Sequence, residues 1–275
     1  MAAKGALAPR QVKRIVTDVL GKRIISALIM LPLALGAIWG GWPYYHLMIT
    51  AGAGILAWEW SSLCGGGNCG KTGWVMVGAI ILSLAAFKFF PEFSLLAIFF
   101  LLLGVGGASL LFRDLGPIWS LGGFVYISLP VLALFALREG PSGTPMIFWL
   151  FGVIWATDIG GYIFGRSIGG PKLAPSISPN KTWAGLLGGM LCAAGVGLAF
   201  AYADWRLAMV SAGLAVLAQI GDLFESKVKR HFGVKDSSQL IPGHGGLLDR
   251  VDGLLFVAPM VWGAIYLRNL GVLAW

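Results

Sequence analysis

Long apolar stretches, separated by short polar segments, run through most of the chain. Each is close to the roughly 20 residues that an α-helix needs to cross a hydrocarbon core of about 30 Å. The pattern therefore predicts an all-α, polytopic membrane protein. About nine transmembrane helices are expected, near residues 24–41, 43–62, 73–90, 93–112, 117–137, 145–165, 183–203, 206–224 and 253–270.

The boundary between the third and fourth stretches is the weakest. Only Lys88, Pro91 and Glu92 interrupt the apolar sequence there. Two interpretations are open, a tight helical hairpin or one broken segment, and the second would reduce the number of spans to eight.

Composition supports a membrane protein over a soluble one. The chain is 57% hydrophobic and 12% charged, whereas soluble domains have roughly 25% charged residues. We expect membrane lipids, and not nucleic acid, as its surroundings and partners. The 41 glycines favour close helix packing in lipid and make a homodimer plausible.

Basic residues fall mainly on one side of the predicted helices. With the N-terminus in the cytosol, the opposite side receives only Lys88, Arg138, Arg206 and Arg268 of the 20 Lys and Arg. This asymmetry is what the positive-inside rule requires. Residues 1–23 then form a basic cytoplasmic arm, which either attracts anionic lipid head groups or only sets the topology.

The predicted spans divide into two regions. Residues 24–144 would hold about five N-terminal helices, and residues 145–275 would hold about four helices of a catalytic region. The cytosolic loops 166–182 and 225–252 of the second region carry most of its polar residues.

Half of the twelve acidic residues lie in that second region and on its cytosolic side, namely Asp158, Asp222, Glu225, Asp236, Asp249 and Asp252. Ionisable groups within spanning segments are costly and usually mark function, so we expect a polar cavity open to the cytosol. The alternative for Asp158 and Asp222 is a helix-end carboxylate that reaches water or pairs with a lysine. If the eighth helix continues past residue 224, Asp222, Glu225, Ser226 and Lys229 share one face.

Three of these carboxylates suit a divalent metal. Mg²⁺ prefers oxygen ligands and usually shares them with substrate phosphates. Asp222, Asp249 and Asp252 could supply such ligands, and the lack of clustered Cys or His argues against zinc or copper.

Two loops have the composition of phosphate-binding segments. Residues 242–246 read Pro-Gly-His-Gly-Gly, and glycines let backbone amides approach an anion. Alone, this turn is weak evidence, and a single histidine such as His244 is more often structural. Loop 166–182 combines Arg166, Lys172 and Lys181 with Ser and Thr hydroxyls, which suits a phosphate ester but also an ordinary positive-inside loop.

The residues from Ser226 to Asp252, SKVKRHFGVKDSSQLIPGHGGLLDRVD, resemble the signature of phosphatidate cytidylyltransferases, also called CDP-diacylglycerol synthases. Residues 157–162, 178–182 and 219–225 are similar to other stretches shared by that family. The resemblance covers roughly residues 150–255. The first 140 residues resemble the family only as a set of apolar spans.

The resemblance implies the reaction of CTP with phosphatidate to give CDP-diacylglycerol and pyrophosphate. It also implies a bacterial-type inner membrane, a cytosolic active site and Mg²⁺, with a second cation left open. Asp222 and Asp249 would be metal ligands, with Asp252 as a third. His244 would contact departing pyrophosphate, and Asp158 would orient a cation or a metal-bound water. Phosphate binding would fall to Lys172, Lys181, Lys227, Lys229, Arg230, Lys235 and Arg250, with Asp236 beside them.

Other functions remain open. The polar motif does not report the lipid tail, so another lipid phosphate could accept the cytidylyl group. An ion-coupled transporter would use Asp158 and Asp222 at the bilayer midplane, but we find no evident inverted repeat. CDP-alcohol phosphotransferases share the start Asp249-Arg250-Val251-Asp252-Gly253, but the residues that follow differ.

Overall fold

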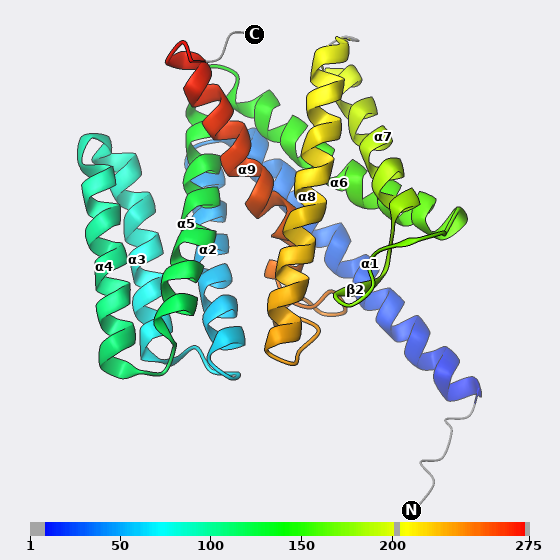
Figure 1. Cartoon of the computed structure of the whole chain (residues 1–275), viewed down its shortest axis with the longest axis horizontal. Coiled ribbons are helices and arrows are strands. Elements are labelled where there is room, and N and C mark those ends of the chain that lie inside the picture. The colour runs from blue at the N-terminus through cyan, green and yellow to red at the C-terminus, as the bar shows by residue number, and fades with distance from the viewer. Residues whose placement is uncertain (1–8, 201–203, 273–275) are drawn as a thin grey trace, which may run out of the picture.

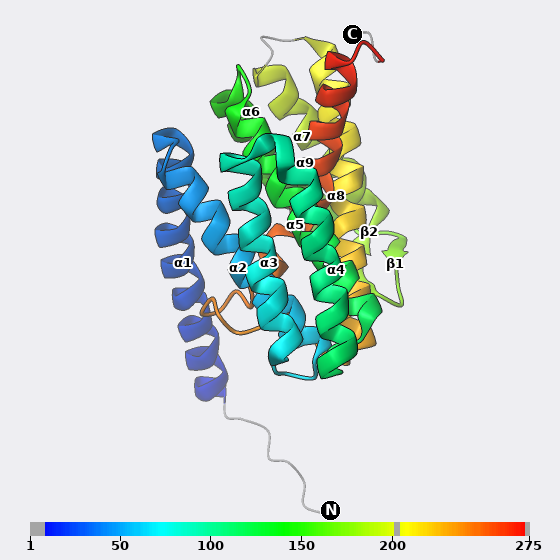
Figure 2. The ribbon, with the colours of Figure 1, turned by 90° about the vertical axis from the view of Figure 1, so that its left-hand side faces the viewer.

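The computed structural model describes residues 9–200 and 204–272, and these fold almost entirely into helices (Figures 1 and 2). The elements are α1 (Pro9–Gly40), α2 (Tyr44–Cys64), α3 (Gly70–Phe89), η1 (Pro91–Phe93), α4 (Ser94–Phe112), α5 (Pro117–Glu139), α6 (Gly143–Ser167), β1 (Lys172–Ala174), β2 (Ser178–Thr182), α7 (Trp183–Phe200), α8 (Trp205–His231) and α9 (Leu248–Asn269).

Eight helices of the described residues, α2 to α9, are long and apolar enough to cross a membrane. The all-α polytopic prediction is confirmed. In α1 the described apolar part, Leu28–Gly40, is shorter. The helix as a whole extends back to Pro9, so the last residues of the predicted basic arm continue into the first apolar run; residues 1–8 and most side chains of the arm lie outside the described part.

The third and fourth apolar runs form a helical hairpin. The helix α3 ends at Phe89, one 3₁₀ turn follows, and α4 begins at Ser94. Pro91 begins this turn, because a proline has no N–H to extend the preceding helix. Of the two interpretations of this boundary, the broken segment is therefore wrong.

Two helices extend beyond the apolar runs that predicted them. The helix α8 continues through the start of the signature to His231, and α9 begins at Leu248, before the apolar run at 253. Within loop 166–182, β1 and β2 form an antiparallel hairpin in which Lys172 pairs with Thr182 and Ala174 with Ser178. The described residues thus add one small β-hairpin to the all-α fold.

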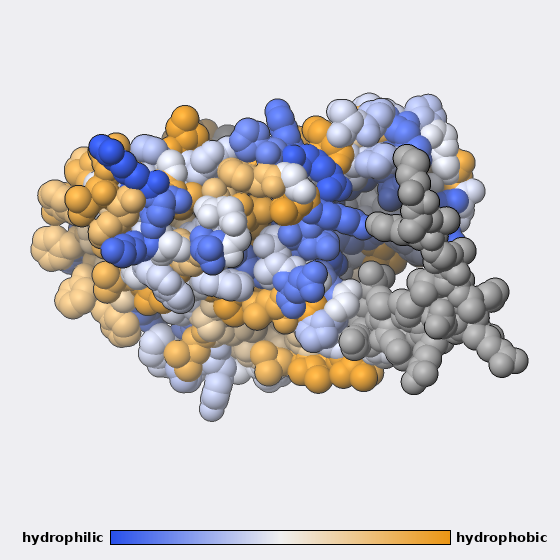
Figure 3. All heavy atoms as spheres, turned by 90° about the horizontal axis from the view of Figure 1, so that it is seen from below, coloured by the Kyte–Doolittle hydropathy of each residue, from blue (hydrophilic) through white to orange (hydrophobic). Residues whose placement is uncertain are grey.

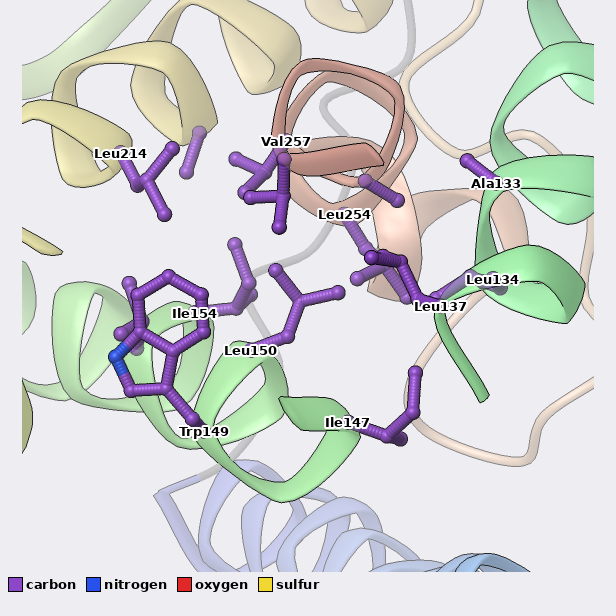
Figure 4. Packing of buried hydrophobic residues seen from close by; sticks show 14 of the residues in the cluster. Ala133, Leu134, Leu137, Ile147, Trp149, Leu150, Ile154, Leu214, Leu254 and Val257 are labelled. Atoms are coloured by element: carbon purple, nitrogen blue, oxygen red, sulfur yellow. The ribbon is translucent and has the colours of Figure 1, made fainter. Parts of the chain in front are cut away.

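The helices share buried side chains across the whole bundle. Leu254 and Val257 of α9 pack between Leu150 and Ile154 of α6 and Leu214 of α8 (Figure 4). A second buried cluster joins α2, α3, α4 and α5 to Val228 of α8 and to Leu248 and Leu255 of α9. The last two helices therefore belong to both clusters.

Close contact between α6 and α7 depends on glycine. A Cβ added at Gly188 of α7 would lie 2.3 Å from Cβ of Phe164, and one at Gly160 of α6 would lie 2.7 Å from Sγ of Cys192. Small residues at such crossings let two backbones approach, as expected for helices in lipid.

One loop caps a neighbouring helix. Asp114, between α4 and α5, accepts hydrogen bonds from the Thr72 hydroxyl and from the amides of Lys71 and Thr72 in the first turn of α3. These amides have no partner within the helix, so Asp114 completes the N-terminus of α3.

The polar segments gather on one side of the bundle. The start of α1 and the turns after α2, α4 and α8 lie at the lower side in Figure 1, opposite the turn of η1. Seen from below, hydrophilic residues cross the middle of this face between apolar areas (Figure 3).

Candidate active site

One face of α8 carries a row of polar side chains, as its helical spacing predicts. Ser226 Oγ donates to Asp222 Oδ1 at 3.2 Å, and Lys229 Nζ donates to Glu225 Oε2 at 3.0 Å. Both pairs are four residues apart. The expectation that these four residues share a face is confirmed, because α8 runs on to His231.

The β-hairpin brings a lysine to this row. Lys181 of β2 forms an ion pair with Asp222, and both side chains are partly shielded from solvent. The two residues are 41 positions apart in the sequence. Thr182, which follows, is buried and its hydroxyl accepts from the amide of Gly185 at the start of α7, which anchors the strand.

A second lysine links α8 to α9. Lys229 Nζ also donates to Asp249 Oδ1 at 2.5 Å, while Glu225 is fully buried. Two carboxylates around one ammonium group carry a net negative charge. In a partly desolvated position this charge favours a further cation.

The loop before α9 fixes the other oxygen of Asp249. Oδ2 accepts hydrogen bonds from Ser237 N and Ser237 Oγ, both at 2.9 Å, and from Gly246 N at 2.8 Å. Gly245 has φ +83°, and a Cβ there would lie 2.9 Å from the same oxygen. The glycine turn thus lies close to the Asp249 carboxylate, and its approach to a substrate anion stays a prediction.

More acidic groups lie within electrostatic range. Asp252 interacts with Asp222, Glu225 and Asp158, and Asp158 interacts with Asp222, Lys181 and Arg250. Asp158 of α6, Asp222 of α8 and Asp252 of α9 are therefore near enough to interact electrostatically.

The donor chemistry of this cluster fits Mg²⁺. Its ligand atoms are carboxylate oxygens, which Mg²⁺ prefers, and the buried Glu225 Oε1 has no hydrogen-bond partner in the described part of the chain. No three His, Cys, Asp or Glu side chains of the described residues converge as a complete metal-binding group. A metal ion bound here would need further ligands, such as phosphate oxygens of a substrate.

The remaining predicted site residues have other partners or exposed positions. His244 Nδ1 is 2.9 Å from Ser26 Oγ of α1, and Arg230 donates to the carbonyl of Val234. The remaining predicted residues, all with exposed side chains, are Lys172, Lys227, Lys235, Asp236 and Arg250.

Two neighbouring residues were missed by the sequence reasoning. Tyr126 of α5 interacts electrostatically with Glu225, Asp252 and Asp222, and its buried hydroxyl has no hydrogen-bond partner among the described residues. Glu59 of α2 contacts the loop before α9. Glu59 could have been found, because it is a carboxylate within a predicted span; Tyr126 has no comparable signal.

Comparison with known proteins identifies the family of this chain. A model of the cytidylyltransferase family matches residues 21–268, which is nearly the whole chain. This chain belongs to the cytidylyltransferase family. The match includes the N-terminal helices, where the sequence alone offers only apolar spans.

Individual members of the cytidylyltransferase family are similar over different lengths. The phosphatidate cytidylyltransferase of Brucella suis is 38% identical over 257 residues, covering 89% of this chain and 93% of that protein. Those of Staphylococcus saprophyticus and Staphylococcus epidermidis are 50% and 51% identical over 111 residues, which cover 38% of this chain and 43% of each relative.

Proposed function

We propose that this protein is a phosphatidate cytidylyltransferase, which converts CTP and phosphatidate into CDP-diacylglycerol and pyrophosphate. The proposal rests on one observation: Lys181 forms an ion pair with Asp222, and Lys229 forms ion pairs with Glu225 and Asp249. Lysines and carboxylates held together at the ends of membrane helices suit a triphosphate and its metal ion. The similarity to the phosphatidate cytidylyltransferase of Brucella suis supports the same activity.

The proposed reaction is an in-line displacement at the α-phosphorus of CTP. An oxygen of the phosphatidate phosphate forms the new P–O bond, the bond to the β-phosphate oxygen breaks, and pyrophosphate leaves with that electron pair. The phosphate monoester is already ionised near neutral pH, so no strong general base is needed. Positioning and neutralisation of negative charge supply most of the catalysis in such transfers.

The site residues divide this work. Lys181 and Lys229 would turn from their carboxylate partners to phosphate oxygens, and Asp222, Asp249 and Asp252 would then be available to hold Mg²⁺. The metal ion, when bound, neutralises charge on the phosphates. Asp158 would orient a cation, and His244 would hydrogen-bond the leaving pyrophosphate. Further phosphate contacts would come from the exposed cations Lys172, Lys227, Arg230, Lys235 and Arg250.

The same proposal places the site at the cytosolic face of a bacterial-type inner membrane. CTP would enter from the cytosol through a polar cavity, and phosphatidate would enter sideways, with its acyl chains in the bilayer. The asymmetry of the basic residues supports this orientation.

The test is transfer of label from CTP into lipid by purified, reconstituted protein with Mg²⁺. We expect label in CDP-diacylglycerol when phosphatidate is supplied, and none when Mg²⁺ is removed by chelation. Faster labelling of another lipid phosphate would assign a different acceptor. No labelling with any lipid phosphate would contradict the proposed function and favour a transporter.

A further inference from the structure

Glu59 is a buried carboxylate that the proposed chemistry does not use. It lies on α2, in the N-terminal half of the chain, and its side chain is fully buried. Burying a charged group is costly unless it is well hydrogen-bonded. Its partners therefore indicate why it is there.

Among the described residues, the hydrogen-bond donors to Glu59 lie in the loop before α9 and at the start of that helix. Oε1 accepts from Ser238 Oγ at 2.6 Å and from Leu247 N at 2.9 Å. Oε2 accepts from Leu248 N at 2.7 Å and lies 3.5 Å from Ser237 Oγ. All of these donors are neutral, so within the described part of the chain the carboxylate is held by hydrogen bonds and not by an ion pair.

These contacts replace a missing helix cap. Leu247, at the N-cap position of α9, has no side chain that can accept a hydrogen bond. The first amides of a helix lack partners within it, and a carboxylate there is also favoured by the helix dipole. Glu59 supplies that acceptor from another helix, 189 residues away from Leu248 in the sequence.

The same loop positions Asp249. Ser237 lies between the two carboxylates, with its hydroxyl 2.9 Å from Asp249 Oδ2 and 3.5 Å from Glu59 Oε2. Gly246 donates to Asp249, and a Cβ at that position would lie 2.0 Å from Ser237 Oγ and 2.6 Å from Glu59 Oε1. The three residues therefore pack without room for an added methyl group.

We propose that Glu59 is a positioning residue for cytidylyl transfer: by holding Ser237, Ser238 and the N-terminus of α9, it fixes Asp249 in its reactive place. Glu59 is fully buried, so it acts through the loop and does not touch substrate. The inference rests on the proposed function, but it adds a role for the N-terminal half of the chain in the geometry of the site.

The deciding variant is Glu59→Gln, which keeps the shape of the side chain. An amide has one accepting oxygen, so its NH2 group must face hydrogen-bond donors of the loop. We expect kcat to fall about 10- to 100-fold, because a displacement of about 1 Å at a reacting group can cost that much. The KM values for CTP and phosphatidate should change less than about threefold, since binding contacts remain.

Hydrogen exchange gives a measurement that does not depend on activity. In Glu59→Gln the amides of Leu247 and Leu248 should exchange faster, while those of α3 and α4 stay as in the wild type. Glu92→Gln is the matched control, because Glu92 is an exposed residue of the turn η1 and should leave both kcat and exchange unchanged.

A second variant keeps the inference testable if Glu59→Gln does not fold. Ser238→Ala removes one donor to Glu59 and should lower kcat in the same direction by less, with faster exchange at Leu247. Where both variants fold, the double variant should be no slower than Glu59→Gln alone, because residues that act through one contact are not additive.

Several results would overturn the inference. They are a kcat of Glu59→Gln within about twofold of the wild type, additive effects in the double variant, or an unchanged kcat of Ser238→Ala when it is the only folded variant. An inactive wild type would instead contradict the proposed function, and the exchange measurement would still report on the cap.

Discussion

Each oxygen of Asp249 has a different environment. Oδ1 faces the ammonium group of Lys229, whereas Oδ2 accepts three hydrogen bonds from the loop. An asparagine cannot satisfy both sides, because its NH2 group must face either the lysine or the loop donors. Asp249 thus links Lys229 of α8 to the loop before α9.

We expect Asp249→Asn to lower cytidylyl transfer by about 10²-fold or more, the cost seen when one electrostatic contact to a transition state is removed. The rate of label transfer from CTP into lipid by the reconstituted variant measures this. The variant should still insert in the membrane and elute as folded protein. Turnover near that of the wild type would remove Asp249 from the metal site.

Charge clustering predicted several site residues for a physical reason. An ionisable residue near a membrane helix end needs water, a counter-ion or a ligand, so Asp158, Asp222 and Asp252 could be singled out without a structure. Glu59 satisfies the same criterion, but it stands far from the signature in the sequence. Its donors are backbone amides and serines, which leave no charge pattern to detect.

Among the elements, α3 depends on a loop outside it for its N-terminal cap. Burial acts to raise the pKa of Asp114, but hydrogen bonds from the Thr72 hydroxyl and from the Thr72 and Lys71 amides outweigh it and lower the pKa below its usual 3.8. A carboxyl with a lowered pKa in the folded state stabilises that state at any pH above about 3.8. That contribution is lost as the pH falls through the lower, folded value.

We therefore expect Asp114→Ala to destabilise the protein near neutral pH by about 1 kcal/mol, as for other lost helix caps. Thermal unfolding in detergent from about pH 7 to about pH 3 checks this. The difference between variant and wild type should shrink toward the acidic end. A difference that grows on acidification would contradict the cap.

The crossing of α6 and α7 tolerates no added bulk at Gly188. We expect Gly188→Val to lower stability by about 1–3 kcal/mol or more, because overpacking forces side chains and backbone to shift. Gly195→Val is the control on the same helix, since a Cβ at Gly195 meets nothing within 4 Å. Melting temperatures of both variants, measured in the same detergent, should differ clearly; equal values would refute the close contact.

Helix ends were harder to predict than helix centres. Hydropathy marks only the apolar part of a helix, so it missed the polar turns that carry α8 to His231 and start α9 at Leu248. Those turns hold Lys229 and Asp249. Hydropathy alone therefore did not show that these two predicted site residues lie on helices.

At the scale of the whole molecule, the turn of η1 and the loop before α9 lie on opposite sides (Figure 1). Glu92 and Gln239 are exposed in these two segments, so cysteines placed there report the orientation. With Cys64, Cys69 and Cys192 replaced by alanine, a membrane-impermeant maleimide should label Glu92→Cys in intact cells. It should label Gln239→Cys only after permeabilisation.

The reverse labelling pattern would place the signature outside the cell, away from CTP. Labelling of both positions in intact cells would mean that the chain inserts in two orientations. Neither result is expected from the distribution of basic residues, which puts most of them on the side of Gln239.

Glu59 and Leu248 are 189 residues apart in the sequence, so they are synthesised at different times. When α2 leaves the ribosome, the backbone amides that its carboxylate needs do not yet exist, and they are made only with the start of the last helix. Until α9 inserts, no growing chain can hold Asp249 as the finished protein does. A chain whose translation stops before α9 would therefore insert in the membrane but could not carry out the proposed cytidylyl transfer.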